Sequence, residues 1–318
     1  PHVHGHRTMH YMLHTDQGDS SILSELKKSD YYIWWGGKND LIAGQEGYHN
    51  HCDTYFEPSK DDFQKWGYEL QEGTHSGDLN WRGSKEGDNY YSFYKGKLDK
   101  KNKDKYFDDD WSMVYGALDF IEDYKNKEPF CLFLPLSYPH PPYCVEEPWY
   151  SSIDRNKIPD RYEYQSWEDK PSLLKGILDG QRMQNWNEEK WRELRAVYLG
   201  MCARVDYQFG LLIDQLKNNN LYDNSLIIFL SDHGDFTGDY GLVEKTQNTF
   251  QDCLTNVPLV IKPPKQHDTR NGLTDEMVEL IDLAGTIYDY ANIKPSYWHF
   301  SKSLKNFINR KIETHRDE

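Results

Sequence analysis

Short apolar runs alternate with amphipathic stretches along most of the chain. Runs of aliphatic and aromatic residues that stop at turn residues predict strands at 31–35, 129–134, 225–230 and 257–262. Apolar residues at helical spacing predict helices at 20–28, 111–124, 188–216 and 274–290. Strands that alternate with helices predict an α/β fold, with a mostly parallel sheet flanked by helices. The continuous apolar run 225–230 is typical of a strand buried on both faces of such a sheet.

Two long polar stretches interrupt this pattern. Residues 50–110 and 145–190 show no clear periodicity and are rich in charged, aromatic and turn-forming residues. We interpret 1–318 as one α/β domain in which these stretches are insertions that shape the substrate side. Residues 268–318 form its C-terminal part.

The charge balance limits the possible partners. The chain has 37 Lys and Arg against 52 Asp and Glu, a formal charge of −15. Binding to nucleic acid or to an anionic membrane surface needs a basic face, and the longest basic cluster is the short one at 100–105. No stretch approaches the ~20 consecutive apolar residues that a membrane span needs. We therefore expect neither nucleic acid nor membrane as a partner, and the oligomeric state stays open.

The aromatic and cysteine contents bear on the kind of site. Aromatic residues make up 15% of the chain, with 24 Tyr and 10 Trp. Such rings pack cores, and they also line carbohydrate or aryl sites, because they combine an apolar face with a polar edge. Five cysteines without a Cys-x-x-Cys pair argue against a disulfide framework or a zinc cluster. Few, unpaired cysteines slightly favour a cytoplasmic location.

Polar clusters follow three of the predicted strands, at 37–40, 137–140 and 231–235. Ligands of open α/β sheets bind at the carboxyl ends of the strands, although each cluster alone is also typical of a solvated turn. Lys38 and Lys245 are compact cations that suit a tetrahedral oxyanion, although most lysines simply lie on the surface.

Asp232 and His233 offer a hard oxygen and an imidazole at adjacent positions. One interpretation is that both bind the same divalent cation. The alternative is that Asp232 caps the turn after the strand and His233 packs against its neighbours.

Several of these segments together resemble the sulfatase family. The block 231–245 resembles the family's late signature, a metal-binding Asp-His followed by Gly-Leu-x-x-Lys, and the Val-Pro-Leu strand at 257–261 follows it. Residues 32–38 resemble a second signature, a strand that leads to Gly-Lys, and 1–8 resemble the segment just after the family's nucleophile. The resemblance covers most of the chain that has predicted secondary structure.

The resemblance implies an alkaline phosphatase-like fold and the hydrolysis of a sulfate ester. Sulfatases use a formylglycine nucleophile and Ca²⁺. By the same resemblance, Asp232 and His233 would be metal ligands, Lys38 and Lys245 would hold the sulfate group, and His140 would contact the sulfate or the leaving oxygen. Asp40 stands where relatives often have histidine, and we expect it to bind a substrate hydroxyl instead.

The sequence departs from the family pattern in one larger respect. It contains no Cys or Ser followed by x-Pro-x-Arg, the motif of the nucleophile. The resemblance places that motif, its formylglycine, the early Asp-Asp metal ligands and the first strand of the sheet upstream of Pro1. We therefore expect a sheet that lacks its first strand, an incomplete calcium site and little or no turnover by this chain alone.

Other functions fit the same residues. Phosphodiesterases and phosphonate monoester hydrolases share the fold and much of the signature, and a non-catalytic protein would bind an oxyanion or a sugar without turnover. A second lysine and the Asp-His pair favour a sulfate ester. The aromatic insertions favour a saccharide sulfate ester over a small aryl sulfate.

Overall fold

We analysed a computed structural model of the chain. It describes residues 19–42, 47–69, 80–99, 106–125, 128–164, 166–168, 170–246 and 249–316. The segment 1–8 and the basic cluster 100–105 lie outside the described residues.

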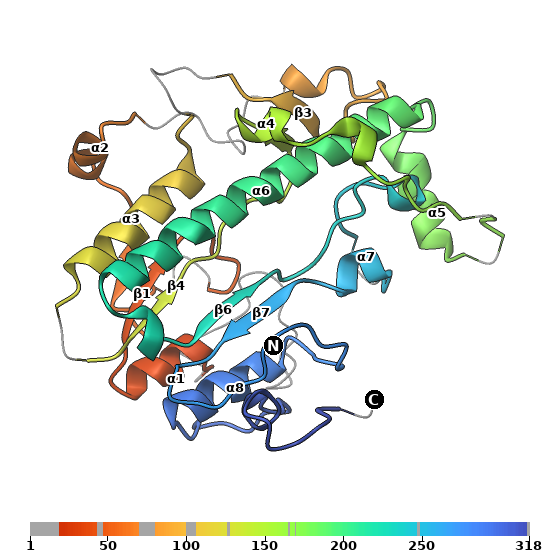
Figure 1. The fold of residues 1–318 in the computed structure, drawn as a ribbon. Helices are drawn as coiled ribbons and strands as arrows, with labels where there is room; N and C mark the ends of the chain where they lie inside the picture. The colour runs from red at the N-terminus through yellow and green to blue at the C-terminus, as the bar shows by residue number, and fades with distance from the viewer. Residues whose placement is uncertain are drawn as a thin grey trace.

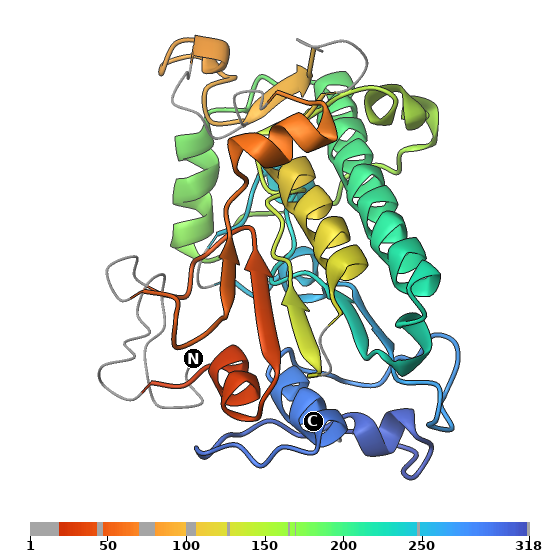
Figure 2. The ribbon, with the colours of Figure 1, turned by 90° about the vertical axis from the view of Figure 1, so that its left-hand side faces the viewer.

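A three-stranded parallel sheet forms the centre of the fold. Its order is β2 (Thr54–Phe56), β1 (Tyr32–Gly36) and β4 (Phe130–Phe133). Trp34 of β1 lies opposite Thr54 on one side and Leu132 on the other. Figure 2 shows the three strands side by side and pointing the same way. Their carboxyl ends therefore meet at one edge of the sheet, as the sequence predicts.

Helices cover both faces of this sheet (Figure 1). On one face, the β1 side chains Ile33 and Trp35 pack in one apolar cluster with α1 (Ile22–Lys28) and α8 (Asp282–Ala291). On the other face, Trp34 stacks on Phe120 of α3 (Asp109–Asp123), with ring centroids 5.7 Å apart. The long helix α6 (Glu188–Asn218) packs against α3 and β5. Because successive side chains of a strand point to opposite faces, the side chains of β1 are divided between two cores.

Local signals place the main helices where the sequence predicts them. Ser21 caps α1 by accepting a hydrogen bond from the Ser24 backbone N–H, and Asp108 caps α3 in the same way through Trp111. Asn187 caps α6, and acidic residues follow it in the first turn. The predicted helix at 274–290 is shorter, because the structure begins α8 at Asp282.

Two smaller sheets lie beside the central one. β3 (Tyr94–Lys97) pairs with β5 (Tyr143–Val145) in parallel, and β6 (Ile227–Leu230) pairs with β7 (Leu259–Lys262) in antiparallel orientation. The prediction that 225–230 is buried in a parallel sheet is therefore wrong. Among the described residues β7 is the only strand hydrogen-bonded to β6, and Leu230 is 41% exposed. An apolar run fixes neither the partner nor the direction of a strand.

The two predicted insertions contain more structure than their lack of periodicity indicates. Residues 50–110 include β2, which belongs to the central sheet. The sequence analysis did not predict this strand, because three residues are too few to show alternation. The remaining helices are α2 (Lys60–Trp66), α4 (Trp149–Ser152), α5 (Ser172–Gln181), α7 (Asp252–Thr255) and α9 (Lys305–Ile308). Within the described residues, none of the helices combines the length and apolar character needed to cross a membrane.

Candidate active site

His140 and Lys245 form the centre of the candidate site. His140 follows β4, and Lys245 lies in the segment between β6 and α7, yet Lys245 Nζ lies 2.9 Å from His140 Nε2. The other ring nitrogen, Nδ1, lies 2.7 Å from the Pro141 carbonyl oxygen. Because a carbonyl only accepts, Nδ1 carries the proton, and Nε2 accepts a hydrogen bond from the Lys245 ammonium group.

Two lysines act on this histidine. Burial, together with the positive charges of Lys245 and Lys38, lowers the pKa of His140 below its ordinary value. The imidazole is therefore neutral at pH 7. Lys38 also pairs with Asp40, whose Oδ2 lies 2.8 Å from Lys38 Nζ. The structure thus brings Lys38, His140 and Lys245 to one region and places Asp40 beside it.

The position of Lys38 depends on the glycine before it. Gly37 has a φ of +114°, and a Cβ atom there would lie 2.2 Å from the Pro135 carbonyl oxygen. That same carbonyl accepts a hydrogen bond from the Lys38 backbone N–H at 2.8 Å. The ends of β1 and β4 therefore approach so closely that only glycine fits.

The predicted metal ligands lie at the edge of this region. The ring of His233 lies 6.3 Å from that of His140, and its Nδ1 donates to the Gly234 carbonyl oxygen at 2.8 Å. Asp232 accepts a hydrogen bond from the His233 backbone N–H, and its side chain is 81% exposed. No group of three His, Cys, Asp or Glu side chains that could hold a metal occurs in the described part of the chain. Since Ca²⁺ takes about 6–8 oxygen ligands, these two residues do not complete a calcium site.

A buried bridge that the sequence analysis did not predict supports Lys245. The Tyr143 hydroxyl donates to Asp235 Oδ1 at 2.7 Å and accepts from the Glu244 backbone N–H at 2.7 Å. Asp235 also accepts from the Thr237 N–H at 2.8 Å. Burial raises the pKa of Asp235 to about 7. The one signal in the sequence for a role of Asp235 is its position inside the late signature. Nothing in the sequence indicates that it pairs with Tyr143.

A second buried group, also missed, fixes the loop that carries His140. The Asp110 carboxylate accepts hydrogen bonds from the backbone N–H groups of Ser137 at 2.9 Å and Tyr138 at 2.8 Å. Below it, the buried guanidinium group of Arg204 lies 4.0 Å from the centre of the Tyr138 ring and 3.1 Å from Glu146. Helix α3 therefore holds the backbone of Ser137 and Tyr138 just before His140, and α6 packs against the Tyr138 ring.

Comparison with known proteins assigns this arrangement to a class. The chain is an α/β protein in which two lysines and a histidine lie near the carboxyl ends of strands. The sequence model of the sulfatase family matches residues 20–293. The chain therefore belongs to the sulfatase family, a family of hydrolases.

Individual relatives are identical to this chain at about a quarter of the aligned residues or fewer. An arylsulfatase of Clostridium perfringens is 25% identical in an alignment of 215 residues, and the alignment covers 64% of this chain and 43% of the relative. The crystal structure of a phosphonate monoester hydrolase of Agrobacterium radiobacter has a TM-score of 0.69 at 22% identity, over 94% of this chain and 63% of that one. A structure of the protein BT4656, in complex with its substrate D-glucosamine-2-N,6-O-disulfate, has a TM-score of 0.60 at 18% identity, over 94% of this chain and 66% of that one. The structural likenesses show the fold, and the chain spans less than half the length of the arylsulfatase.

The close packing of Gly234 gives a first prediction. A Cβ atom at this position would lie 1.9 Å from the Cys253 carbonyl oxygen, and the Gly234 N–H donates to Leu254 at 2.8 Å. We expect Gly234→Ala to lower the free energy of unfolding by about 1–3 kcal/mol, measured by urea denaturation. Gly180→Ala in α5 is the control, since its Cβ meets no atom within 4 Å. Equal stability of the two variants would contradict the packing argument.

The raised pKa of Asp235 predicts a pH dependence of stability. Between its ordinary value of 3.8 and about 7, the folded state keeps a proton that the unfolded state releases. The contribution of Asp235 to stability is therefore complete below pH 3.8 and falls as the pH rises to 7, by at most about 1.4 kcal/mol per pH unit. Asp235→Asn keeps the acceptor for Tyr143 and should remove this slope. Urea denaturation of both proteins from pH 4.5 to 8 tests it, and identical slopes would refute it.

The contacts of Asp110 predict a local defect in the loop before His140. Asp110→Asn replaces one acceptor with an amide donor that faces a backbone N–H, so we expect a loss of about 1–3 kcal/mol in unfolding free energy. Asp109→Asn, an exposed neighbour on the same helical turn, should cost less than about 1 kcal/mol. Nitrogen-15 NMR of His140 should show a changed ring environment in Asp110→Asn alone. An unchanged ring signal would mean that Asp110 does not position this histidine.

Proposed function

We propose that this protein hydrolyses sulfate esters, with Lys38, His140 and Lys245 holding the sulfate group. The observation that carries the proposal is the contact of Lys245 with His140, whose pKa is lowered by burial and by the charges of Lys245 and Lys38. Two ammonium groups and one imidazole thus converge at the carboxyl ends of the strands in a chain of the sulfatase family.

The three side chains have complementary roles in this proposal. The lysines neutralise the negative charge that develops on the sulfate oxygens and the leaving oxygen as the ester bond breaks. His140 is neutral in the free protein and accepts from Lys245, so it holds that ammonium group in place. A bound sulfate ester adds negative charge beside the ring and so favours uptake of a proton from solvent at Nε2; this ends the hydrogen bond from Lys245, whose ammonium group then donates to the sulfate oxygens. His140 Nε2–H is then able to donate to the leaving oxygen.

Sulfatases typically use Ca²⁺ and formylglycine, and we propose Asp232 and His233 as two of the calcium ligands. The ion would supply positive charge to the sulfate oxygens. Both residues lie directly after β6, and the ring of His233 faces the region of His140. The remaining ligands would come from outside the described residues. We derive no reaction step through the ion.

A saccharide sulfate ester is the substrate class that we propose. A pocket of about 230 Å³ adjoins the loop that leads to Lys245 and is lined by aromatic rings, among them those of Tyr164, Trp167 and Tyr240. The Tyr240 N–H donates to the Tyr162 carbonyl oxygen, which ties the stretch 145–190 to this loop. Aromatic faces with polar edges suit the apolar faces and hydroxyls of a sugar ring. The ligand of BT4656 is also a sulfated sugar.

Paired assays of the purified natural protein test this function. We expect hydrolysis of glucosamine 6-sulfate and 4-nitrophenyl sulfate with higher kcat/KM than hydrolysis of phenyl phosphonate or 4-nitrophenyl phosphate. Lys245→Ala should lower kcat/KM for the sulfate esters by about 100-fold or more, because it removes a charge from the transition state.

Lys265→Ala is the matched control for this assay. Lys265 is an exposed lysine that pairs with Asp223. It follows the carboxyl end of β7, which lies beside the amino end of β6 and therefore away from the site. We expect its kcat/KM to stay within about twofold of the unchanged protein. A higher kcat/KM for the phosphonate or phosphate esters would replace the proposed function with that of a phosphorus ester hydrolase. Full activity of Lys245→Ala would remove this lysine from the mechanism.

A further inference from the structure

Glu244, the residue before Lys245, places a carboxylate inside the candidate site. Its Oε1 lies 3.2 Å from Lys245 Nζ and 3.7 Å from His140 Nε2, and its side chain is 26% exposed. A negative charge at this place repels the sulfate group that both of these partners are proposed to hold. The carboxylate therefore needs an explanation beyond the binding of sulfate itself.

The backbone of Glu244 is held in an unusual conformation. Its φ is +61°, in the left-handed region that a glutamate rarely adopts. Its N–H donates to the Tyr143 hydroxyl at 2.7 Å, and its carbonyl oxygen accepts from the Phe236 N–H at 2.9 Å. The two hydrogen bonds keep the residue in this conformation. The side chain therefore starts from a fixed point, from which it reaches both Lys245 and His140.

The two oxygens of the Glu244 carboxylate differ in their contacts. Oε1 accepts a hydrogen bond from the Lys245 ammonium group. Oε2 has no hydrogen-bond partner among the described residues, and it is open to solvent. An ionised carboxylate accepts at both oxygens. A donor on the substrate therefore reaches Oε2 without displacing a contact within the described part of the protein.

The charges of the site also suit a substrate that carries a cation. Lys38 and Lys245 contribute two positive charges, and Asp40 pairs with Lys38. With Glu244 beside Lys245 and a neutral His140, the formal charges of these five side chains sum to zero. They give little net attraction to a substrate that is an anion overall. A substrate with both a sulfate and an ammonium group instead places each charge beside an opposite one.

We propose that Glu244 selects sulfate esters with an ammonium group close to the ester bond. The matching class is an amino sugar or amino alcohol whose amino group lies on the carbon next to the sulfated one. Oε2 accepts a charge-assisted hydrogen bond from the ammonium group, and Oε1 keeps Lys245 directed toward the sulfate oxygens. The inference rests on the proposed function, because it requires Lys245 and His140 to hold the sulfate group.

Two probes that contain no ester bond test this selection by binding alone. 3-Aminopropane-1-sulfonate and butane-1-sulfonate share a sulfonate group, and the first has an ammonium group where the second has a methyl group. Each is titrated into the natural protein in a buffer with Ca²⁺ at constant ionic strength and pH 7, and saturation-transfer NMR gives the dissociation constants. We expect the aminosulfonate to bind at least about tenfold more tightly, because it adds a hydrogen bond between charged groups.

The variant Glu244→Gln tests the carboxylate itself. The amide keeps an oxygen that accepts from Lys245, and the backbone hydrogen bonds are unaffected, so we expect the fold to be retained. The variant should bind the aminosulfonate more weakly and butane-1-sulfonate more tightly, each by about threefold, because an attraction and a repulsion are removed together. Glu122→Gln is the matched control. Glu122 is exposed near the end of α3 that leads to the amino end of β4, away from the site, and this variant should keep the tenfold preference.

The outcomes distinguish this inference from the proposed function. Saturable binding of both probes with equal affinity would retain the sulfate site and overturn the selection. A preference that persists in Glu244→Gln, or that falls equally in both variants, would also overturn the role of Glu244. No saturable binding of either probe below about 100 mM would overturn the sulfate site on which the inference rests.

Discussion

The candidate site depends on the two hydrogen bonds made by the buried hydroxyl group of Tyr143. This hydroxyl joins three segments, since Tyr143 lies in β5, Asp235 follows β6 and Glu244 precedes Lys245. One hydroxyl both donates and accepts here, and each partner is a group that would be costly to bury without a hydrogen bond. The loop that carries Lys245 is thereby fixed in its position relative to β5 and β6. The contact of Lys245 with His140 follows from that fixed position.

The electrostatics of the site have a cost in stability. Asp235 and Asp110 are both carboxyl groups in buried surroundings, and burial raises the pKa of each, to about 7 and about 6. Burial of these groups disfavours their charged forms, yet Asp110 orients the backbone before His140 and Asp235 holds the hydroxyl that fixes the backbone before Lys245. Stability is commonly lower where a fold builds a binding site, and the two carboxyl groups are examples of that compromise.

Much of the fold was predictable because periodicity is a local property. The strands at 31–35, 129–134 and 257–262 and the helices at 20–28, 111–124 and 188–216 are confirmed, and the signature residues identified the family. The direction of β6 and the membership of β2 in the central sheet were not predictable, because both depend on a partner that is distant in sequence. The same limit applies to the Tyr143 bridge, whose members are separated by about a hundred residues.

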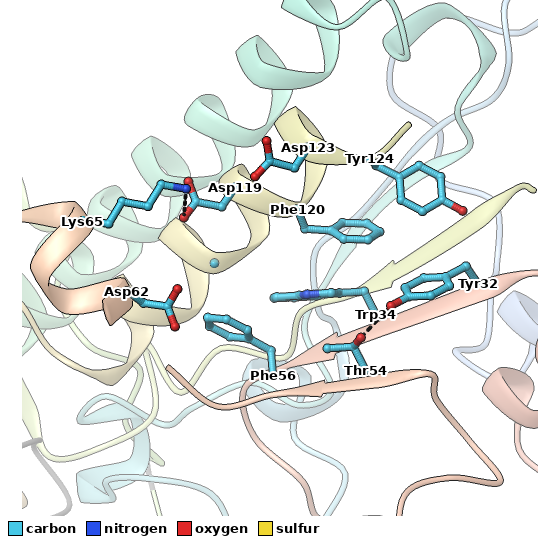
Figure 3. A pocket seen from close by; sticks show the side chains of 11 residues that line it. Tyr32, Trp34, Thr54, Phe56, Asp62, Lys65, Asp119, Phe120, Asp123 and Tyr124 are labelled. Atoms are coloured by element: carbon cyan, nitrogen blue, oxygen red, sulfur yellow. Dashed lines mark hydrogen bonds and ion pairs between the residues drawn. The ribbon is translucent and has the colours of Figure 1, made fainter. Parts of the chain in front are cut away.

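Strand β1 shows how one short segment serves several purposes at once. Its odd-numbered residues Ile33 and Trp35 are buried toward α1 and α8 and anchor a core. Its even-numbered residue Trp34 is buried toward α3, where its ring stacks on Phe120 (Figure 3). At its carboxyl end, Gly37 allows the close approach to Pro135 that directs Lys38 toward the site. A one-residue shift in register would exchange the two faces, so the packing on both faces and the position of the lysine all constrain the same register.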